Sequence, residues 1–225
     1  MTTGPDGRPG RILPSWDDNA AAWIEVVREG RLESRQAATD AAVIGAVVET
    51  APRRVLDVGC GEGWLARTLG ERHGIDAVGV DGCEALVAAA RAAGVTGHVA
   101  DYQTLAREPL AFGRFDTVVC NFSLLERELL PLLRALHALL EDDGRLVVQT
   151  VHPAAANGQQ GWHEESFSRF GPGFRTAMPW YQHSASAWER QLTEAGFRQV
   201  SAAEVTHPQR GTPLSLLLRA RAGKV

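Results

Sequence analysis

The sequence predicts an α/β fold in which helices flank a doubly wound, mostly parallel sheet. Between Val55 and Val151, short apolar runs alternate with helical patterns, as they do when strands are buried on both faces of a parallel sheet. After this region, two β runs over 198–206 and 214–220 are joined by a short, turn-rich link. Because the link is too short for a crossover helix, we expect these strands to form an antiparallel C-terminal hairpin.

The N-terminal part of the chain predicts a tail followed by helices. Residues 1–14 are rich in glycine and proline and form a predicted flexible tail. A helix is predicted to begin at Ser15, where Asp18 has the spacing of a capping box. A second helical pattern covers 34–50 and ends before a proline. Together the two helices predict an N-terminal helical cap over 15–50.

Five apolar runs form the predicted parallel strands, at 55–58, 77–80, 98–100, 115–120 and 146–151. Leucine- or alanine-rich segments with helical spacing separate these runs. In the helix that begins near Glu128, Pro131 lies in the first turn, where proline is tolerated. This order of strands and helices is the pattern that the parallel sheet requires.

Residues 152–183 interrupt the alternation with prolines, glycines and aromatic residues that follow no clear period. A connection of this length is usually a lid or a binding element, so we predict a lid or substrate insertion after the fifth strand. A helix then begins at Ser186, with Glu189 at capping-box spacing, and ends at Gly196. We expect 15–225 to form one domain.

The composition favours an enzyme that acts on a small molecule. With 44% hydrophobic residues the chain can form a full core, and its 23 Lys and Arg against 27 Asp and Glu give a net charge of −4. It therefore lacks the excess of cations that duplex binding requires. No apolar run approaches the roughly 20 residues of a membrane span, and no signal segment opens the chain. We expect a cytoplasmic protein that binds neither nucleic acid nor a membrane.

The cysteines do not suggest a disulfide framework or a metal site. Cys60, Cys83 and Cys120 have no CxxC spacing, which argues against a structural zinc. We therefore expect no metal.

A glycine-rich segment, VLDVGCGEGW over 55–64, contains the end of the first strand. Glycines at a strand-to-helix turn let the backbone approach a ligand closely. The third glycine, however, comes one residue too early for the dinucleotide fingerprint G-x-G-x-x-G. Asp57 and Glu62 flank the loop and would repel a pyrophosphate, whereas they would attract a ligand that carries an ammonium and a sulfonium. The segment therefore predicts a site for S-adenosylmethionine.

Polar residues also follow the next three strands. Asp81 ends the second strand and is placed to accept hydrogen bonds from both ribose hydroxyls, because such a ligand lies across the carboxyl ends of the strands. Asp101, followed by Tyr102, ends the third strand, where a carboxylate can accept from an adenine amino group. Asn121, followed by Phe122, ends the fourth strand, near the expected place of the methionine portion and the methyl group.

These motifs resemble those of the class I S-adenosylmethionine-dependent methyltransferases. The resemblance covers about residues 50–151 and rests on 55–67, 80–81, 101–102 and 115–125, in the family's order and spacing. It implies methyl transfer and a Rossmann-like sheet of seven strands, the seventh of which belongs to the C-terminal hairpin. The stretch 120–122 together with 149–153 looks like a bacterial subgroup that acts on small molecules.

The resemblance also implies roles for single residues. Asp57 and Asn121 would hold the methionine amino group, Asp81 the ribose and Asp101 the adenine. Arg35 is a candidate to clamp the methionine carboxylate, and a solvated surface arginine is the alternative. The full predicted cofactor set is Arg35, Asp57, Gly59, Cys60, Gly61, Asp81, Gly82, Asp101, Tyr102, Asn121 and Phe122. As alternatives, the glycines could serve only a tight turn, and Asp81 and Asp101 could be helix N-caps.

Methyl transfer is an in-line displacement, for which the protein must align the reacting atoms and exclude water. A hydroxyl acceptor usually needs a base. His152 directly follows the fifth strand and is our first candidate because imidazole titrates near neutrality; Tyr181 is the second. Alternatively, His152 only hydrogen-bonds the backbone before Pro153.

The predicted acceptor site consists mainly of aromatic residues, which suit a planar or hydrophobic acceptor. Its members are Trp16, Trp162, His163, Trp180, Tyr181 and His183. The lid aromatics could instead form the lid's own core, and Trp16 could simply pack on the fold together with Trp23.

The leading hypothesis is a methyltransferase whose acceptor is a small molecule with an oxygen, nitrogen or carbon nucleophile. Two alternatives remain. One is a nicotinamide-dependent oxidoreductase on the same kind of sheet, and the other is a module that binds S-adenosylmethionine without catalysis.

Overall fold

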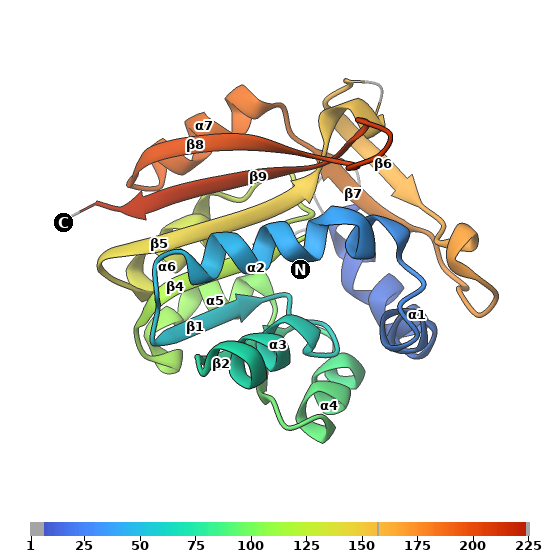
Figure 1. Cartoon of the computed structure of the whole chain (residues 1–225), viewed down its shortest axis with the longest axis horizontal. Helices are drawn as coiled ribbons and strands as arrows, with labels where there is room; N and C mark the ends of the chain where they lie inside the picture. Colours follow the sequence, from blue (N-terminus) through green and yellow to red (C-terminus); the bar gives the residue numbers. More distant parts are fainter. Residues whose placement is uncertain (1–6, 157, 224–225) are drawn as a thin grey trace.

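The computed structural model describes residues 7–156 and 158–223. Its main sheet has seven strands in the order β3-β2-β1-β4-β5-β9-β8 (Figure 1). The parallel strands are β1 (Arg54–Val58), β2 (Asp76–Asp81), β3 (Thr96–Val99), β4 (Phe115–Asn121) and β5 (Leu140–Val151). The prediction of a doubly wound, mostly parallel sheet is confirmed. The strand order reverses between β1 and β4, and ligands of such sheets bind outside the carboxyl ends of the strands at that point.

The C-terminal hairpin is also confirmed. It consists of β8 (Phe197–Thr206) and β9 (Pro213–Ala222), which pair antiparallel to each other. β9 also pairs antiparallel to β5, so the hairpin extends the sheet on the side of β5 and leaves β8 at its edge (Figure 1).

Helices cover both faces of the sheet. On one face, Val47, Leu69 and Val119 belong to a buried cluster that joins the sheet to two helices, α2 (Asp40–Val48) and α3 (Trp64–His73). On the other face, Leu133 and Trp188 share a cluster with the sheet. The helices of this face are α5 (Tyr102–Arg107), α6 (Leu130–Leu139) and α7 (Ala185–Glu194). Apart from the N-terminal helix, the remaining helical segments of the described residues are α4 (Glu84–Ala92), a π-helix at Arg35–Thr39 and 3-10 turns at Pro109–Phe112, Pro153–Ala156 and Ser168–Phe170.

The N-terminal helix α1 (Pro9–Arg28) begins earlier than predicted. Residues 9–14 of the expected tail are helical, because proline is accepted in a first turn and Ile12 provides a buried apolar side chain. Ser15 does not cap the helix; it is buried inside it, and its hydroxyl donates to the carbonyl of Ile12 (2.6 Å). Residues 1–6 of the predicted tail lie outside the described residues.

The segment 152–183 has more regular structure than its sequence suggests. β6 (Gly161–Glu165) and β7 (Met178–Gln182) pair antiparallel in a separate two-stranded sheet, and α1 lies against β7 (Figure 1). Asn19 of α1 fastens this contact: its Nδ2 donates to the carbonyl of Thr176 (2.7 Å), and its Oδ1 accepts from the backbone N–H of Arg175 (2.8 Å). Helix α1 and the two-stranded sheet therefore form one connected cover.

The cap of α7 differs from the prediction by two residues. Ser184, not Ser186, is the N-cap, and its hydroxyl accepts from the backbone N–H of Ala187 (3.2 Å). In the described part of the chain, no helix combines the length and the apolar character needed to cross a membrane.

Candidate active site

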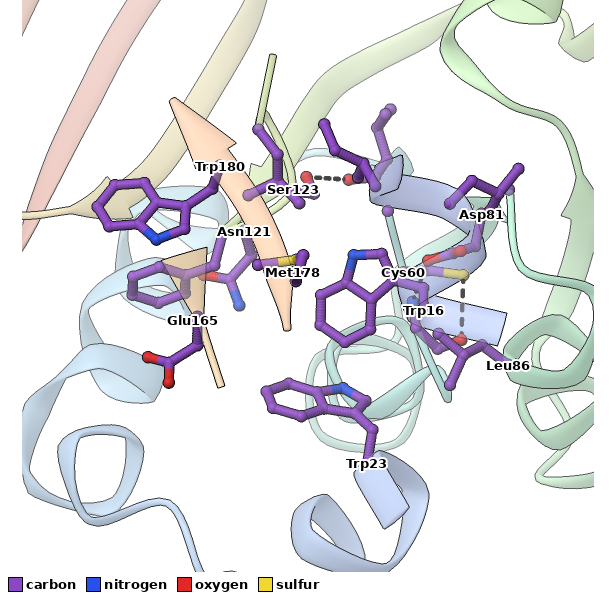
Figure 2. A pocket seen from close by; sticks show the side chains of 18 of the residues that line it. Trp16, Trp23, Cys60, Asp81, Leu86, Asn121, Ser123, Glu165, Met178 and Trp180 are labelled. Carbon is purple, nitrogen blue, oxygen red and sulfur yellow. Dashed lines mark hydrogen bonds between the residues drawn. The ribbon is translucent and has the colours of Figure 1, made fainter. Parts of the chain in front are cut away.

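A cavity of about 930 Å³ lies at the carboxyl ends of the parallel strands, between the sheet and the cover formed by α1, β6 and β7 (Figure 2). Its wall includes ten residues of the predicted cofactor set: Arg35, Gly59, Cys60, Gly61, Asp81, Gly82, Asp101, Tyr102, Asn121 and Phe122. Three of the predicted acceptor residues, Trp16, His163 and Trp180, also line it. The structure therefore brings most of the predicted cofactor residues into one cavity, but only half of the predicted acceptor residues.

The glycine loop fits closely between β1 and the segment after β4. Gly59 has a φ of +73°, and a Cβ built on it would lie 2.2 Å from the Cβ of Ser123. The N–H groups of Gly59 and Cys60 both donate to the carbonyl of Val80 (2.7 and 3.0 Å). Since only glycine fits here without a clash, this glycine has a steric role beyond that of a tight turn.

Asp81 connects the glycine loop to the start of α4. Its Oδ2 accepts from the N–H of Gly61, and its Oδ1 accepts from the N–H of Cys83, both at 2.9 Å. The N-cap of α4 is Cys83, not Asp81. Burial raises the pKa of Asp81. Asp101 does cap a helix, since it accepts from the N–H of Thr104 (2.8 Å), and it also lines the cavity.

Asp57 lies behind the glycine loop rather than in the cavity wall. The side chain is buried, and its Oδ2 has no hydrogen-bond partner among the described residues. Burial, with a smaller contribution from Asp81, raises the pKa of Asp57 to about 7. A cation bound nearby would stabilise the ionised form, so a buried carboxyl group with one unpartnered oxygen fits a positively charged ligand.

Glu62 differs from this pattern. Its buried carboxylate lies 3.3 Å from Nε of Arg28 and 3.5 Å from an Nη atom of Arg67. Because two guanidinium groups balance its charge, Glu62 contributes less to the negative field of the loop than the sequence suggests.

Arg35 is placed in the cavity wall by the π-helix. Its Nε donates to Oδ1 of Asp40 (2.8 Å), and its guanidinium lies over the ring of Trp64, 3.9 Å from the centroid. With a side chain only 14% exposed, it is not a solvated surface arginine. The fixed guanidinium suits recognition of a carboxylate.

The cover contributes aromatic side chains to the cavity through strand alternation. In β7, Met178 and Trp180 line the cavity, and their cross-strand partners Glu165 and His163 do as well. The rings of Trp180 and His163 are in contact, with centroids 5.0 Å apart and planes tilted by 30°. Alternate residues of a strand face opposite sides, and this period could have identified Met178 and Glu165 from the sequence.

Helix α1 supplies two tryptophans to the cavity: Trp16, a predicted acceptor residue, and Trp23, which the alternative interpretation packs against the fold together with Trp16. Trp16 and Trp23 contact each other edge to face with centroids 5.3 Å apart, and both line the cavity (Figure 2). Phe167 of the cover lies 5.5 Å from Trp16 and 5.8 Å from Trp23. These rings are both a packing cluster and a wall of the cavity.

Besides Asp57, four predicted site residues lie outside the cavity wall. Trp162 and Tyr181 are cross-strand partners on the other side of the two-stranded sheet, with ring centroids 5.5 Å apart. The buried His183 directs its Nε2 to the carbonyl of Glu126 (3.0 Å). The structure does not bring these three residues to the cavity. Trp162 and Tyr181 alternate along their strands with residues that line it. His183 follows the end of β7.

The fourth is His152, the predicted base. Val151 lines the cavity, whereas the next residue does not. The Nδ1 of His152 accepts from the N–H of Ala154 (3.1 Å), and its Nε2 lies 3.3 Å from Oε1 of Glu204 on β8. The role as a base is not supported by this position, and the alternative of a backbone hydrogen bond is the one that the geometry supports.

Replacing His152 by alanine should therefore leave methyl transfer within about twofold of the wild type, because a base must lie within hydrogen-bond reach of the proton that it takes. The measurement is the initial rate of S-adenosylhomocysteine formation with an accepted substrate. A 100-fold loss in a variant that remains folded would restore His152 as the base.

Comparison with known proteins agrees with this geometry. The family model described as a methyltransferase domain matches residues 32–202. The chain is 35% identical over 108 residues to a ubiquinone biosynthesis O-methyltransferase of Pseudomonas aeruginosa (45% of this chain, 46% of the relative). It is 38% identical over 116 residues to one of Xanthomonas euvesicatoria (48% of each). The matched part spans about half the length of these curated relatives.

Solved structures show the same fold. An S-adenosylmethionine-dependent methyltransferase from Mesorhizobium loti has a TM-score of 0.57 at 25% identity, covering 75% of this chain and 90% of its own. Magnesium protoporphyrin IX methyltransferase from Synechocystis PCC 6803, solved with bound S-adenosylhomocysteine, has a TM-score of 0.67 at 19% identity, covering 96% and 100%. The chain belongs to the class I S-adenosylmethionine-dependent methyltransferases.

Proposed function

We propose that this protein transfers the methyl group of S-adenosylmethionine to a hydroxyl oxygen of a small, planar, mostly apolar molecule. The observation that carries the proposal is the aromatic wall of Trp16, Trp23 and Trp180 in the same cavity as the glycine loop and Asp81. Flat side chains of this kind favour a planar acceptor.

The assignment of oxygen is supported by the relatives. Those matched at 35–38% identity are named O-methyltransferases. The family match does not favour the nicotinamide-dependent alternative. Measuring turnover distinguishes our proposal from the alternative of a module that binds S-adenosylmethionine without catalysis.

Different residues of the cavity are proposed to bind different parts of the cofactor. Asp81 is the proposed acceptor for the ribose hydroxyls, Asp101 for the adenine amino group, and Arg35 the partner of the methionine carboxylate. The negative charge of Asp57 favours a ligand with an ammonium and a sulfonium. When bound, S-adenosylmethionine supplies a methyl group whose bond to sulfur breaks with both electrons remaining on sulfur.

The cover has the second task of excluding water, which would otherwise compete at the reacting centre. Trp180 and the Trp16–Trp23 pair orient a flat acceptor against the methyl group. Holding the reacting atoms in line in this way lowers the barrier to methyl transfer. Among the described residues that line the cavity, His163 is the only imidazole, and its Nε2 lies 3.2 Å from the carbonyl of Gln159.

A panel of phenols, catechols, amines and thiols, each assayed for S-adenosylhomocysteine by mass spectrometry, tests the proposal. We expect turnover with a phenol or catechol. For that substrate, Trp180→Ala should raise KM about tenfold, because a stacked aromatic contact contributes about 0.5–1.5 kcal/mol. Trp162→Ala, which removes a tryptophan from the opposite face of the same sheet, is the matched control. Turnover confined to amines or thiols would contradict the proposal.

A further inference from the structure

The side chain of Asn121 presents a hydrogen-bond donor to the cavity. Its Oδ1 accepts from Nε2 of Gln149 (2.7 Å), and Gln149 does not belong to the cavity wall. The Nδ2 of Asn121 has no acceptor among the described residues. Figure 2 shows Asn121 on the same side of the pocket as Trp180, with Asp81 and Leu86 on the opposite side. The amide oxygen is thus turned away, and the NH₂ group is the part that faces the cavity. This orientation does not agree with the expected contact between Asn121 and the methionine amino group, because an NH₂ group cannot accept a hydrogen bond from an ammonium.

The orientation of both amides follows from a backbone carbonyl. Gln149 is only 1% exposed, and its Nε2 also donates to the carbonyl of Thr39 (3.0 Å). A carbonyl can only accept, so this atom of Gln149 must be the nitrogen. The hydroxyl of Ser215 donates to Oε1 of Gln149 (3.1 Å), which agrees with the assignment. Because Nε2 of Gln149 can only donate hydrogen bonds, the atom of Asn121 that lies 2.7 Å from it must be the amide oxygen.

The backbone next to Asn121 is fixed by the same residue. Phe122 has a φ of +54°, a conformation that non-glycine residues rarely adopt, and its N–H donates to the carbonyl of Gln149 (2.7 Å). Strained backbone of this kind persists where the surroundings determine it, often at functional sites. Gln149 therefore positions Asn121 through its side chain and the following residue through its backbone.

Resting on the proposed function, we propose that Asn121 Nδ2 donates to the hydroxyl oxygen of the acceptor and stabilises its anion, with Gln149 as the positioning residue. A neutral amide cannot take up the proton. The acceptor loses it to bulk water as it enters the cavity, before methyl transfer, and the donor favours this ionisation by lowering the pKa of the hydroxyl. A lone pair of the oxygen then forms the bond to the methyl carbon as the carbon–sulfur bond breaks and its electrons stay on sulfur.

The donor also explains a preference for oxygen. An oxygen anion keeps lone pairs for attack while it accepts a hydrogen bond. An amine nitrogen has only one lone pair, and accepting from Asn121 would occupy it. The methionine carboxylate of the cofactor would be a competing acceptor for Asn121 Nδ2, but the fixed guanidinium of Arg35 is the stronger partner for it.

The test uses 4-nitrophenol, whose absorbance reports its ionisation, with protein saturated with S-adenosylhomocysteine. Bound to the wild type, the probe should ionise at a lower pH than in free solution. Asn121→Asp keeps the shape but turns an acceptor to the cavity, and should raise the pKa of the bound probe by at least one pH unit above its wild-type value. Gln149→Leu should remove part of the wild-type effect. Gln209→Glu, an amide-to-carboxylate change at an exposed site, is the control.

Calorimetric titration with S-adenosylmethionine separates the possible failures. We expect Asn121→Asp not to weaken that affinity, because an added negative charge in the cavity favours a positively charged ligand. A wild type without affinity for S-adenosylmethionine would contradict the proposed function itself. The inference about Asn121 alone is overturned if the probe does not bind or if its titration is the same in Asn121→Asp. It is also overturned if that variant instead loses tenfold or more in cofactor affinity, which would assign Nδ2 to the methionine carboxylate.

Discussion

Replacing Asp81 by alanine should weaken the binding of S-adenosylmethionine about 100-fold. The carboxylate is the proposed acceptor for the ribose hydroxyls, and hydrogen bonds to charged groups contribute about 1.5–3 kcal/mol each. It also holds the N–H groups of Gly61 and Cys83, so its loss loosens two segments of the cavity wall. Calorimetry with the purified variant measures the effect.

A control is available on the same strand. Asp76 begins β2, where its carboxylate pairs with Nε of Arg54 (3.2 Å) at the end of the strand remote from the cavity. Asp76→Ala should leave the affinity unchanged. If Asp81→Ala remained folded and bound S-adenosylmethionine as tightly as the wild type, Asp81 would have no part in the site.

Replacing Gly59 by alanine should lower the free energy of unfolding by about 2–5 kcal/mol and abolish cofactor binding. A left-handed conformation costs a residue with a Cβ about 1–2 kcal/mol, and overpacking adds about 1–3 kcal/mol. The second contribution arises because the new Cβ would lie 2.2 Å from the Cβ of Ser123. Urea unfolding measures the loss.

Gly74 separates the two contributions. It has a similar φ of +66°, but a Cβ there would have no atom within 4 Å. Gly74→Ala should therefore cost only the conformational part. Adding Ser123→Gly to Gly59→Ala should recover part of the stability, because it removes the atom that clashes. Equal losses for Gly59→Ala and Gly74→Ala would show that close contact with Ser123 is unimportant.

The sheet and the cofactor half of the site could be predicted because their signals are local. The apolar runs and the glycine loop mark strand ends within a few residues. Asp81 is the last residue of β2, and Asp101 follows the end of β3 by two residues. Parallel strands bring those ends to one edge of the sheet, so a sequence pattern becomes a spatial cluster.

The acceptor half of the site was harder to predict because it depends on which side of a strand each side chain occupies. His152 and Tyr181 are each one residue away from a position that lines the cavity, Val151 and Trp180. A shift of one residue in a strand changes the face. The segment that contains β6 and β7 shows no clear period in the sequence, so the alternation that distinguishes their two faces is visible only in the structure.

The orientation of Asn121 depends on contacts between distant parts of the chain. It is determined by Gln149 on the neighbouring strand, which is in turn determined by the carbonyl of Thr39. The local sequence around Asn121 contains no sign of this arrangement. The start of α1 at Pro9 also depends on contacts with distant residues. Ile12 lies within the predicted tail, but its side chain is buried in the fold.

The central claim is that the cavity is built for a positively charged alkyl donor and not for a dinucleotide. Calorimetric titration of the wild-type protein with S-adenosylmethionine, and separately with NAD, tests it most directly. We expect one molecule of S-adenosylmethionine per chain and no heat of binding with NAD. Saturable binding of NAD, or no binding of S-adenosylmethionine, would contradict the claim.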